Sequence, residues 1–209
     1  MATIDFFDRG WRINPTGAAY IQDDREFSFN EVGELSCRIA NALLALGFPK
    51  ETKGAIWATN DVTAWTCTLG LWRANMCWIP VGARNAAEEN HYILDAFDCE
   101  VLFFQKYFAA AIAEMQPRLP KIKHWVCVDG DAPEIVGSVA LQTWIKEQPT
   151  TRPTVAVDMN DMAMLSSTGG TTGMPMGVMN THRSLQTFCA HYTISCHYLA
   201  EEKIVNLAA

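Results

Sequence analysis

The chain has 209 residues, 49% of them apolar and 19% charged, which is enough for one large domain or two small ones around a buried core. Its net charge of −7 argues against a nucleic-acid-binding protein, because such proteins carry a basic face. The densest basic stretch consists of Arg118, Lys121, Lys123 and His124, and we expect it to be a solvated loop.

The cysteines and the start of the chain indicate the compartment. Seven cysteines are scattered mostly through apolar runs, and their odd number favours free thiols in a reducing compartment over a disulfide framework. The sequence contains no CxxC pair and therefore no zinc signature. We expect no signal peptide, because the first residues lack a basic region followed by an apolar run, and no apolar run in the sequence reaches the roughly 18 residues that cross a bilayer. We therefore expect a soluble, cytoplasmic protein without a transmembrane segment.

The first elements in chain order are a short helix within residues 1–14 and a β-hairpin. The hairpin strands are expected at Ala18–Gln22 and Glu26–Phe29, on either side of a turn that contains two aspartates. A helix then begins at Ser28, because Ser28 and Glu31 form a capping box in which each side chain can bond the other residue's amide. Gly47 can adopt the left-handed conformation that ends this helix.

Short buried strands then alternate with amphipathic helices, which is typical of a mostly parallel sheet flanked by helices. The expected strands are Lys53–Ala58, Met76–Val81, Glu100–Phe104, His124–Val128, Met162–Thr168, Gly177–Thr181 and the beginning of a strand at Ile204–Ala208. The expected helices begin at Asn60 or Asp61, at Asn85 with Glu88 completing the cap, near residue 106 and near Arg183, the last running to about Leu199; Asn75 ends the first of them. The sequence therefore predicts an α/β fold.

Residues 129–157 interrupt this pattern. They are rich in proline, glycine, aspartate and threonine, and we expect an irregular connection with one helical turn around Leu141–Lys146. The chain ends inside an apolar stretch without a polar tail, so we also expect it to be truncated.

Residues 166–178, SSTGGTTGMPMGV, form the stretch most indicative of chemistry. Glycines allow sharp turns and close approach of the backbone, and successive amides can form a concave nest for an anion. Threonine hydroxyls add donors without adding charge. The loop is not a Walker A motif, because Met174 and Pro175 stand where that motif has lysine and serine or threonine. A tight surface loop of small residues is the alternative.

This stretch, followed by Thr181 and His182, resembles the phosphate-loop signature of the adenylate-forming superfamily, in particular of AMP-forming acyl-CoA synthetases. That signature is a Ser/Thr/Gly-rich run, then Pro-Lys-Gly-Val and a Thr-His pair. The resemblance covers nearly the whole chain. Weaker matches to the family pattern fall in the right order, at Phe27–Gly47, Ala55–Asn60, Leu69–Pro80 and Glu88–Leu94.

The resemblance implies ATP-dependent activation of a carboxylic acid, most often a fatty acid, to an acyl-adenylate and its transfer to coenzyme A. ATP, Mg²⁺ and coenzyme A are the implied cofactors or substrates. The residues implied against the phosphates are Thr168, Gly169, Gly170, Thr171, Thr172 and Gly173, with Ser167 at the edge. Residues 1–209 then form a partial N-terminal adenylation domain. The rest of that domain and a C-terminal domain with the catalytic lysine are missing, so this chain alone is expected to be inactive; homo-oligomerisation stays open.

Two departures from the family pattern matter. Met176 replaces the lysine that lies near the phosphates in relatives, and a thioether carries no charge. A non-catalytic relative that binds nucleotide or acyl-adenylate is therefore one alternative, and an adenylation domain that loads a carrier protein is another. Gly82-Ala83-Arg84-Asn85 stands where relatives often have Asn-Pro-Arg, which we interpret as a local loop variation.

Other histidine, cysteine, arginine and tryptophan residues are also candidates for a site. His182 is expected to be a structural residue at a helix start rather than a phosphate neighbour. Cys189, His191, Cys196 and His197 share one helix. All but His191 can converge on one face, but no carboxylate is spaced to complete the set, so no metal site is predicted. We expect Arg73 and Arg84 to lie on the surface rather than against a coenzyme A phosphate. The tryptophans Trp57, Trp65, Trp72 and Trp78 are expected in the core.

Overall fold

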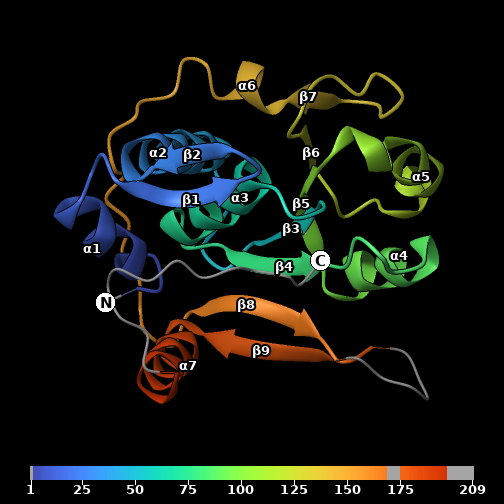
Figure 1. Ribbon diagram of the computed structural model, residues 1–209. Helices are drawn as coiled ribbons and strands as arrows, with labels where there is room; N and C mark the ends of the chain where they lie inside the picture. The colour runs from blue at the N-terminus through green and yellow to red at the C-terminus, as the bar shows by residue number, and fades with distance from the viewer. Residues whose placement is uncertain (1, 169–174, 197–209) are drawn as a thin grey trace.

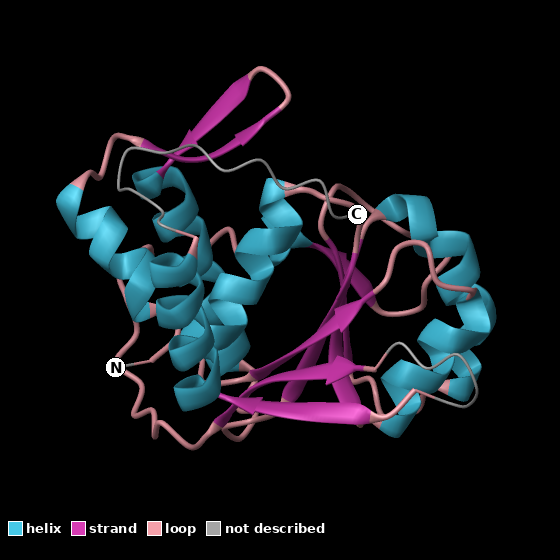
Figure 2. Ribbon diagram, turned by 60° about the horizontal axis from the view of Figure 1, so that its bottom comes forward, coloured by secondary structure: helices cyan, strands magenta, loops and turns pink. Residues whose placement is uncertain are grey.

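The computed structural model describes residues 2–168 and 175–196, and within them a seven-stranded sheet lies between two layers of helices (Figures 1 and 2). Its strands are β3 (Lys53–Trp57), β4 (Cys77–Val81), β5 (Cys99–Phe104), β6 (His124–Cys127), β7 (Ser138–Ala140), β8 (Met162–Ser167) and β9 (Gly177–Thr181). Their order is β7-β6-β5-β3-β4-β8-β9, and every neighbouring pair is parallel except β8 and β9. The predicted α/β class is confirmed.

The helices cover both faces of the sheet because alternate strand residues point to opposite sides. Phe103 packs in the cluster formed with α2 and α3, whereas the next residue, Phe104, packs in the cluster formed with α4 and α5. The helices are α1 (Asp5–Ile13), α2 (Phe29–Ala45), α3 (Val62–Arg73), α4 (Ala87–Ala96), α5 (Ala109–Met115), α6 (Leu141–Trp144) and α7 (His182–Ser195), with 3₁₀ turns at Lys106–Phe108 and Gln116–Arg118. Figure 2 shows the sheet between the two groups of helices.

The first half of the chain follows the predicted signals closely. β1 (Ala18–Gln22) and β2 (Arg25–Ser28) pair as an antiparallel hairpin. The capping box is present, since the Glu31 amide donates to Ser28 Oγ at 3.2 Å and the Ser28 amide donates to the Glu31 carboxylate at 2.8 Å. Gly47 and Asn75 follow the ends of α2 and α3 with φ of 74° and 54°.

The predicted cap of α4 was wrong. The helix begins at Ala87 after Ala86, and no side chain caps it. The Asn85 side-chain amide nitrogen, Nδ2, instead donates to Asn90 Oδ1 at 3.0 Å, and Asn90 Nδ2 donates to the Gly82 carbonyl at 3.0 Å. Asn85 therefore closes the loop before the helix rather than binding a helix amide.

The connection between β6 and β8 is mostly irregular, as predicted, and contains the predicted helical turn α6. The sequence did not predict β7, which has only three residues and pairs with the edge of β6. Beyond α6 the chain crosses the outside of α2. Arg38 donates to the Gln148 carbonyl at 2.8 Å, and Asn41 donates to the Pro149 and Thr151 carbonyls at 3.0 Å. These bonds hold the connection against α2 as the chain passes from β7, at one edge of the sheet, to β8, near the other edge.

Three of the four tryptophans that were expected in the core form an edge-to-face cluster beside β8. Trp65, Trp72 and Trp78 have ring centroids 5.5–6.0 Å apart at interplanar angles of 83–90°. The Trp72 indole donates to the Ala163 carbonyl at 2.8 Å, which ties α3 to β8. Trp57 is buried against Phe108 on the other face. The tryptophans therefore contribute to the core, as predicted.

The cysteines give a direct test of this packing. Cys37, Cys67, Cys77, Cys99 and Cys127 are buried, whereas Cys189 and Cys196 are exposed on and after α7. Burial raises the pKa of Cys77 and Cys99 to about 12, so these thiols stay protonated near neutral pH. We expect Ellman's reagent to modify Cys189 and Cys196 in the native protein and the five buried thiols only after denaturation. Rapid native modification of more than these two would contradict the packing.

No helix in the described ranges combines the length and apolarity needed to cross a membrane.

Candidate functional site

The β8–β9 hairpin carries the predicted phosphate loop. Its described ends meet through two hydrogen bonds: the Thr168 amide donates to the Met176 carbonyl at 2.9 Å, and the Met176 amide donates to Thr168 Oγ1 at 3.1 Å. Of the six predicted phosphate-binding residues, only Thr168 lies within the described residues; Gly169, Gly170, Thr171, Thr172 and Gly173 lie outside them. The bounds of both strands agree closely with the predicted ones.

The position of this hairpin in the sheet is favourable for ligand binding. β8 runs parallel to β4, so the start of the loop lies at the edge where the parallel strands have their carboxyl ends. Ligands of open α/β sheets bind at this edge. Gly177 fits tightly there, because a Cβ at this position would lie 3.0 Å from Leu165 Cδ1 and 3.2 Å from Phe97 Cε1. The loop is thus connected to a strand that packs closely against the end of α4.

Met176 stands at the family's lysine position and is 71% exposed. A lysine there would not have to be desolvated, so the packing of the described residues does not require methionine. The difference from the family pattern is therefore a difference in charge at the exposed start of β9.

His182 lies at the opposite edge of the sheet from Thr168. β9 runs antiparallel to β8, so the residue that follows β9 lies beside the start of β8, and the His182 amide donates to the Asp161 carbonyl at 3.1 Å. The His182 side chain is completely buried and contacts Thr3 and Asn75. The expected structural role of His182 at a helix start is therefore the correct one.

Asp161, which the sequence did not single out, is the charged centre of that edge. Lys50 Nζ contacts Asp161 Oδ1 at 2.6 Å, and the side-chain nitrogen Nδ2 of Asn75 donates to Asp161 Oδ2 at 2.8 Å. These bonds, that of Lys50 first, lower the pKa of Asp161 to about 2. No local motif marks a lone aspartate before a strand, because its partners come from residues 50 and 75.

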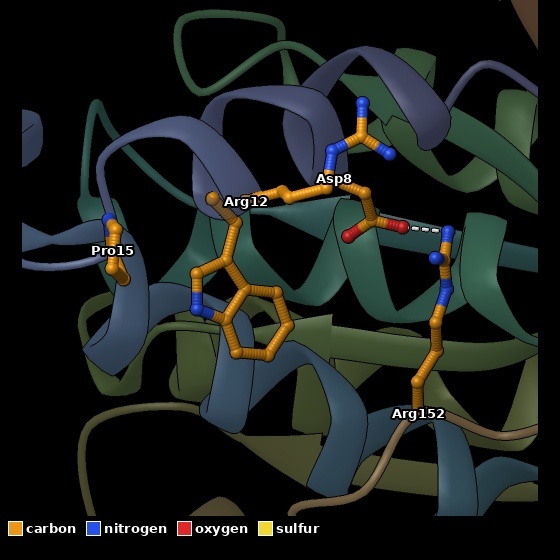
Figure 3. Close-up of a pocket in the computed structure, with 5 residues that line it drawn as sticks. Asp8, Arg12, Pro15 and Arg152 are labelled. Atoms are coloured by element: carbon orange, nitrogen blue, oxygen red, sulfur yellow. Dashed lines mark ion pairs between the residues drawn. The ribbon is translucent and has the colours of Figure 1, made fainter.

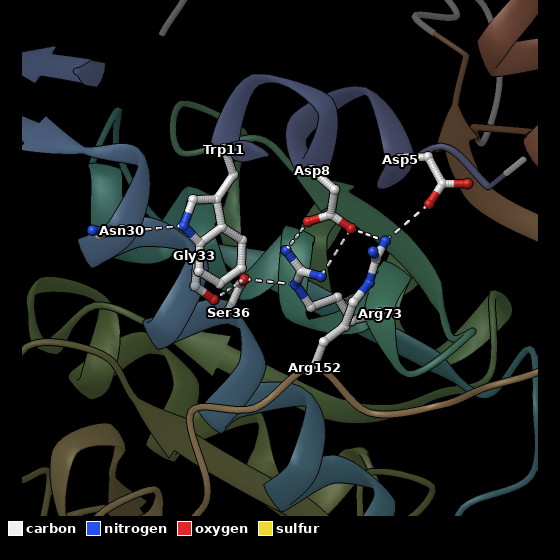
Figure 4. A network of polar contacts seen from close by, with 8 residues as sticks. All are labelled: Asp5, Asp8, Trp11, Asn30, Gly33, Ser36, Arg73 and Arg152. Carbon is white, nitrogen blue, oxygen red and sulfur yellow. Dashed lines mark hydrogen bonds and ion pairs between the residues drawn. The ribbon is translucent and has the colours of Figure 1, made fainter. Parts of the chain in front are cut away.

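Arg73 was predicted to lie on the surface, and this prediction was wrong. The residue is 4% exposed, and its guanidinium forms an ion pair with Asp8 of α1 while Nε donates to Ser36 Oγ at 2.8 Å (Figure 4). It also lies over the ring of Trp11, 5.6 Å from the centroid. The last turn of α3 faces α1, so a residue that follows an apolar stripe becomes enclosed between helices. Arg84 is exposed, as predicted.

A surface hollow next to this network does not form the candidate site. It is lined by Asp8, Trp11, Arg12, Pro15 and Arg152, and Asp8 and Arg152 form an ion pair across it (Figure 3). Arg152 also donates to Asp5 Oδ1 at 2.9 Å. The hollow is open to solvent, and this ion pair ties α1 to the connection that leads to β8.

The predicted basic stretch has its charges compensated. Arg118 pairs with Glu88 at 2.7 Å, Lys121 with Asp98 at 2.9 Å, and Lys123 with Glu100. These pairs leave no concentrated positive surface along the stretch. Within the described ranges, no group of three or more histidine, cysteine or acidic side chains is placed to hold a metal ion. Cys189 and Cys196 are exposed, and His197 lies outside the described residues.

The sequence pattern of the family described as AMP-binding enzyme matches residues 7–208, which is nearly the whole chain. The chain belongs to the AMP-binding enzyme family. The matched region includes β8, β9 and the stretch between them that resembles the phosphate-loop signature.

Curated and solved relatives agree with this assignment. The chain is 28% identical over 184 residues to 4-hydroxybenzoate–CoA/benzoate–CoA ligase from Rhodopseudomonas palustris, covering 88% of this chain and 34% of the ligase. It is 25% identical over 190 residues to the long-chain-fatty-acid–CoA ligase FadD13 from Mycobacterium tuberculosis, covering 89% and 36%. The crystal structure of the anthranilate CoA ligase AuaEII with anthranoyl-AMP shares the fold, with a TM-score of 0.86 at 22% identity, covering 93% and 37%. The chain thus spans about a third of the length of these CoA ligases.

Proposed function

We propose that this chain is the N-terminal part of an ATP-dependent carboxylate–CoA ligase. Such an enzyme joins a carboxylate to the α-phosphate of ATP, releases pyrophosphate, and passes the acyl group to the thiol of coenzyme A. The observation that carries the proposal is the phosphate-loop signature at the carboxyl edge of β8, in a chain of the AMP-binding enzyme family. The two curated relatives described above, both CoA ligases, support the reaction class.

The proposed phosphate-binding residues are Thr168, Gly169, Gly170, Thr171, Thr172 and Gly173. Amides and hydroxyls of this composition suit a polyphosphate, and Mg²⁺ would neutralise part of its charge. Thr168 is compatible with this role, because its hydroxyl oxygen accepts from the Met176 amide and its proton is left to donate to a phosphate oxygen. We propose ATP, Mg²⁺ and coenzyme A as the substrates or cofactors of the longer enzyme.

The rest of the active site would lie outside these 209 residues. The chain covers about a third of the length of the relatives, which supports its being part of a longer polypeptide. A fatty acid is the first substrate that we propose. The relatives also include ligases of aromatic acids, so aryl acids come next. By itself, the 209-residue chain is expected not to complete the reaction.

The test is carboxylate-dependent release of pyrophosphate from Mg-ATP. The 209-residue chain and the longest open reading frame that contains it would be assayed in parallel with fatty, aryl and amino acids. Release by the longer protein alone, with preference for one acid class, would establish the ligase and its substrate class. If the acyl group passed to a carrier-protein thiol and never to free coenzyme A, the CoA-ligase assignment would be wrong.

Met176 favours a second function, that of a relative that binds nucleotide or acyl-adenylate without turnover. We expect Met176→Lys in the longer protein to raise the rate of adenylation by about tenfold or more if the protein is a ligase, because it restores positive charge near the phosphates. Met176→Gln is the matched control, since it is polar, uncharged and similar in size. Measured pyrophosphate release that is absent in the parent and unchanged in both variants would support the non-catalytic function.

A further inference from the structure

The open end of the β8–β9 hairpin is fixed by a buried chain of hydrogen bonds that begins at His182. The ring Nδ1 lies 3.1 Å from the Thr3 backbone amide and 2.9 Å from Thr3 Oγ1. The backbone amide can only donate, whereas the hydroxyl can donate or accept, so an Nδ1 without a proton satisfies both contacts. The ring proton is therefore on Nε2, which lies 3.4 Å from Asn75 Oδ1. His182 is thus assigned as the neutral tautomer with one acceptor and one donor, each facing a matching partner.

Asp161 determines the orientation of Asn75 in this chain. The Asn75 amide nitrogen donates to Asp161 Oδ2 at 2.8 Å and to the Ala156 carbonyl at 3.1 Å, so the side-chain oxygen is the atom that faces His182. Lys50 and the Asp158 amide bond the same carboxylate. The sequence Thr3–His182–Asn75–Asp161–Lys50 therefore connects both strands of the hairpin to the N-terminus and to the end of α3.

We propose that His182 is a positioning residue for the candidate phosphate site: in its neutral form it fixes the open end of the β8–β9 hairpin and thereby sets where Thr168 and Met176 lie at the other end. The coupling distance is the length of β9, five residues, or about 17 Å at the rise of an extended strand. Every residue of β9 pairs with β8, with one register shift between Met162 and Met164, and this ladder is the path by which we expect a displacement at His182 to reach Met176. This inference deepens the proposed function and rests on it for its significance.

The arrangement predicts dependence on pH. Protonation would place the ring's second N–H on Nδ1. The bond from the Thr3 backbone amide would then be lost, because two donors would face each other, and Thr3 Oγ1 would have to change from donor to acceptor. Burial lowers the pKa of His182 most, and the positive amino terminus lowers it further. The negative charges of Asp161, Asp5 and Glu51 raise it, but the net shift is downward. The pKa of His182 in the folded state lies below the ordinary value of 6.5. The contribution of the neutral ring to the free energy of unfolding is therefore complete above pH 6.5 and is lost as the pH falls through the folded-state pKa.

The experiment is hydrogen–deuterium exchange on the 209-residue chain, read by peptide. His182→Leu should speed exchange in residues 176–181 by about tenfold or more and leave residues 32–43 of α2 unchanged. His191→Leu is the matched control, the same change at an exposed position of the same helix, and should alter neither segment. If His182→Leu does not fold, His182→Asn gives the same comparison, since its Oδ1 can replace Nδ1 as acceptor while its shorter side chain has no N–H at the position of Nε2.

Lowering the pH from about 7.5 to about 5.5 should speed exchange in residues 176–181 of the parent, after correction for the intrinsic rate, but not in His182→Leu or His182→Asn. Equal acceleration across all peptides of His182→Leu would indicate general destabilisation and overturn the inference, as would the same pH effect without the histidine. Mg-ATP titration of the longer protein separates the two proposals. Local exchange effects in the 209-residue chain, together with a longer protein that never binds Mg-ATP, would support the role of His182 and contradict the proposed function.

Discussion

Replacing Arg73 with methionine is expected to lower the free energy of unfolding by about 3–5 kcal/mol, the range for removal of one partner of a buried ion pair. The Arg73 side chain is 1% exposed and that of Asp8 is 8% exposed, so the remaining carboxylate stays largely out of water. The substitution also removes Nε, which donates a hydrogen bond to Ser36 Oγ. Arg152 remains beside Asp8 and compensates part of the charge. Urea unfolding followed by tryptophan fluorescence measures the effect.

Two controls separate this effect from loss of an arginine in general. Arg118→Met breaks a pair whose side chains are 48% and 73% exposed, and it should cost only about 0–1 kcal/mol. The double variant Asp8→Leu with Arg73→Met removes both charges, so its loss should be smaller than the sum of the two single losses. Strict additivity would show that the ion pair is not the source of the effect.

Phe103→Ala should also cost about 3–5 kcal/mol, because it removes a fully buried ring and leaves a cavity. Phe103 lies on β5, inside the sheet, and packs between the strands and the α2–α3 layer, where its ring is also 6.1 Å from that of Trp144. The backbone of β5 pairs with strands on both sides, so the surrounding structure has little freedom to collapse into the space.

Phe188→Ala is the matched comparison for this second prediction. Phe188 is 63% exposed on α7, where its ring stacks on Tyr192. Its removal leaves no enclosed cavity and should change the free energy of unfolding by less than about 1 kcal/mol. Similar losses for both variants in urea unfolding would mean that β5 does not lie at the centre of the core.

The sequence predicted the fold well where local signals were strong. The Ser28–Glu31 capping box, the buried strands around Lys53–Trp57 and the Asn75 helix end all depend on neighbouring residues, and each is confirmed. The α4 cap failed because Asn85 bonds Asn90, a partner that a capping pattern does not consider. β7 was missed because three residues are too short for a period-two pattern.

In the candidate site, too, the features that depend on neighbouring residues were predicted and those that depend on distant partners were not. The loop signature is local, and the sequence placed it between two strands that the structure contains. Arg73, Asp161 and Lys50 could not be predicted in their roles, since each depends on a partner far along the chain: residues 8 and 73 form one pair, and residues 50 and 161 another. Burial of such charged groups is decided by how helices and strands assemble, which periodicity does not specify.

The bond between the Thr3 amide and His182 joins residues 179 positions apart, so the start of the chain waits for nearly the last described element. During synthesis the nascent chain emerges from its N-terminus, and strands β3 to β6 can pair before residues 162–182 leave the ribosome. Thr3 can complete its hydrogen bond, and Ala2 and Ile4 the cluster that they share with Ala163, only after β8, β9 and the first turn of α7 have been made. Residues 2–4 are therefore among the last of the described residues to be fixed.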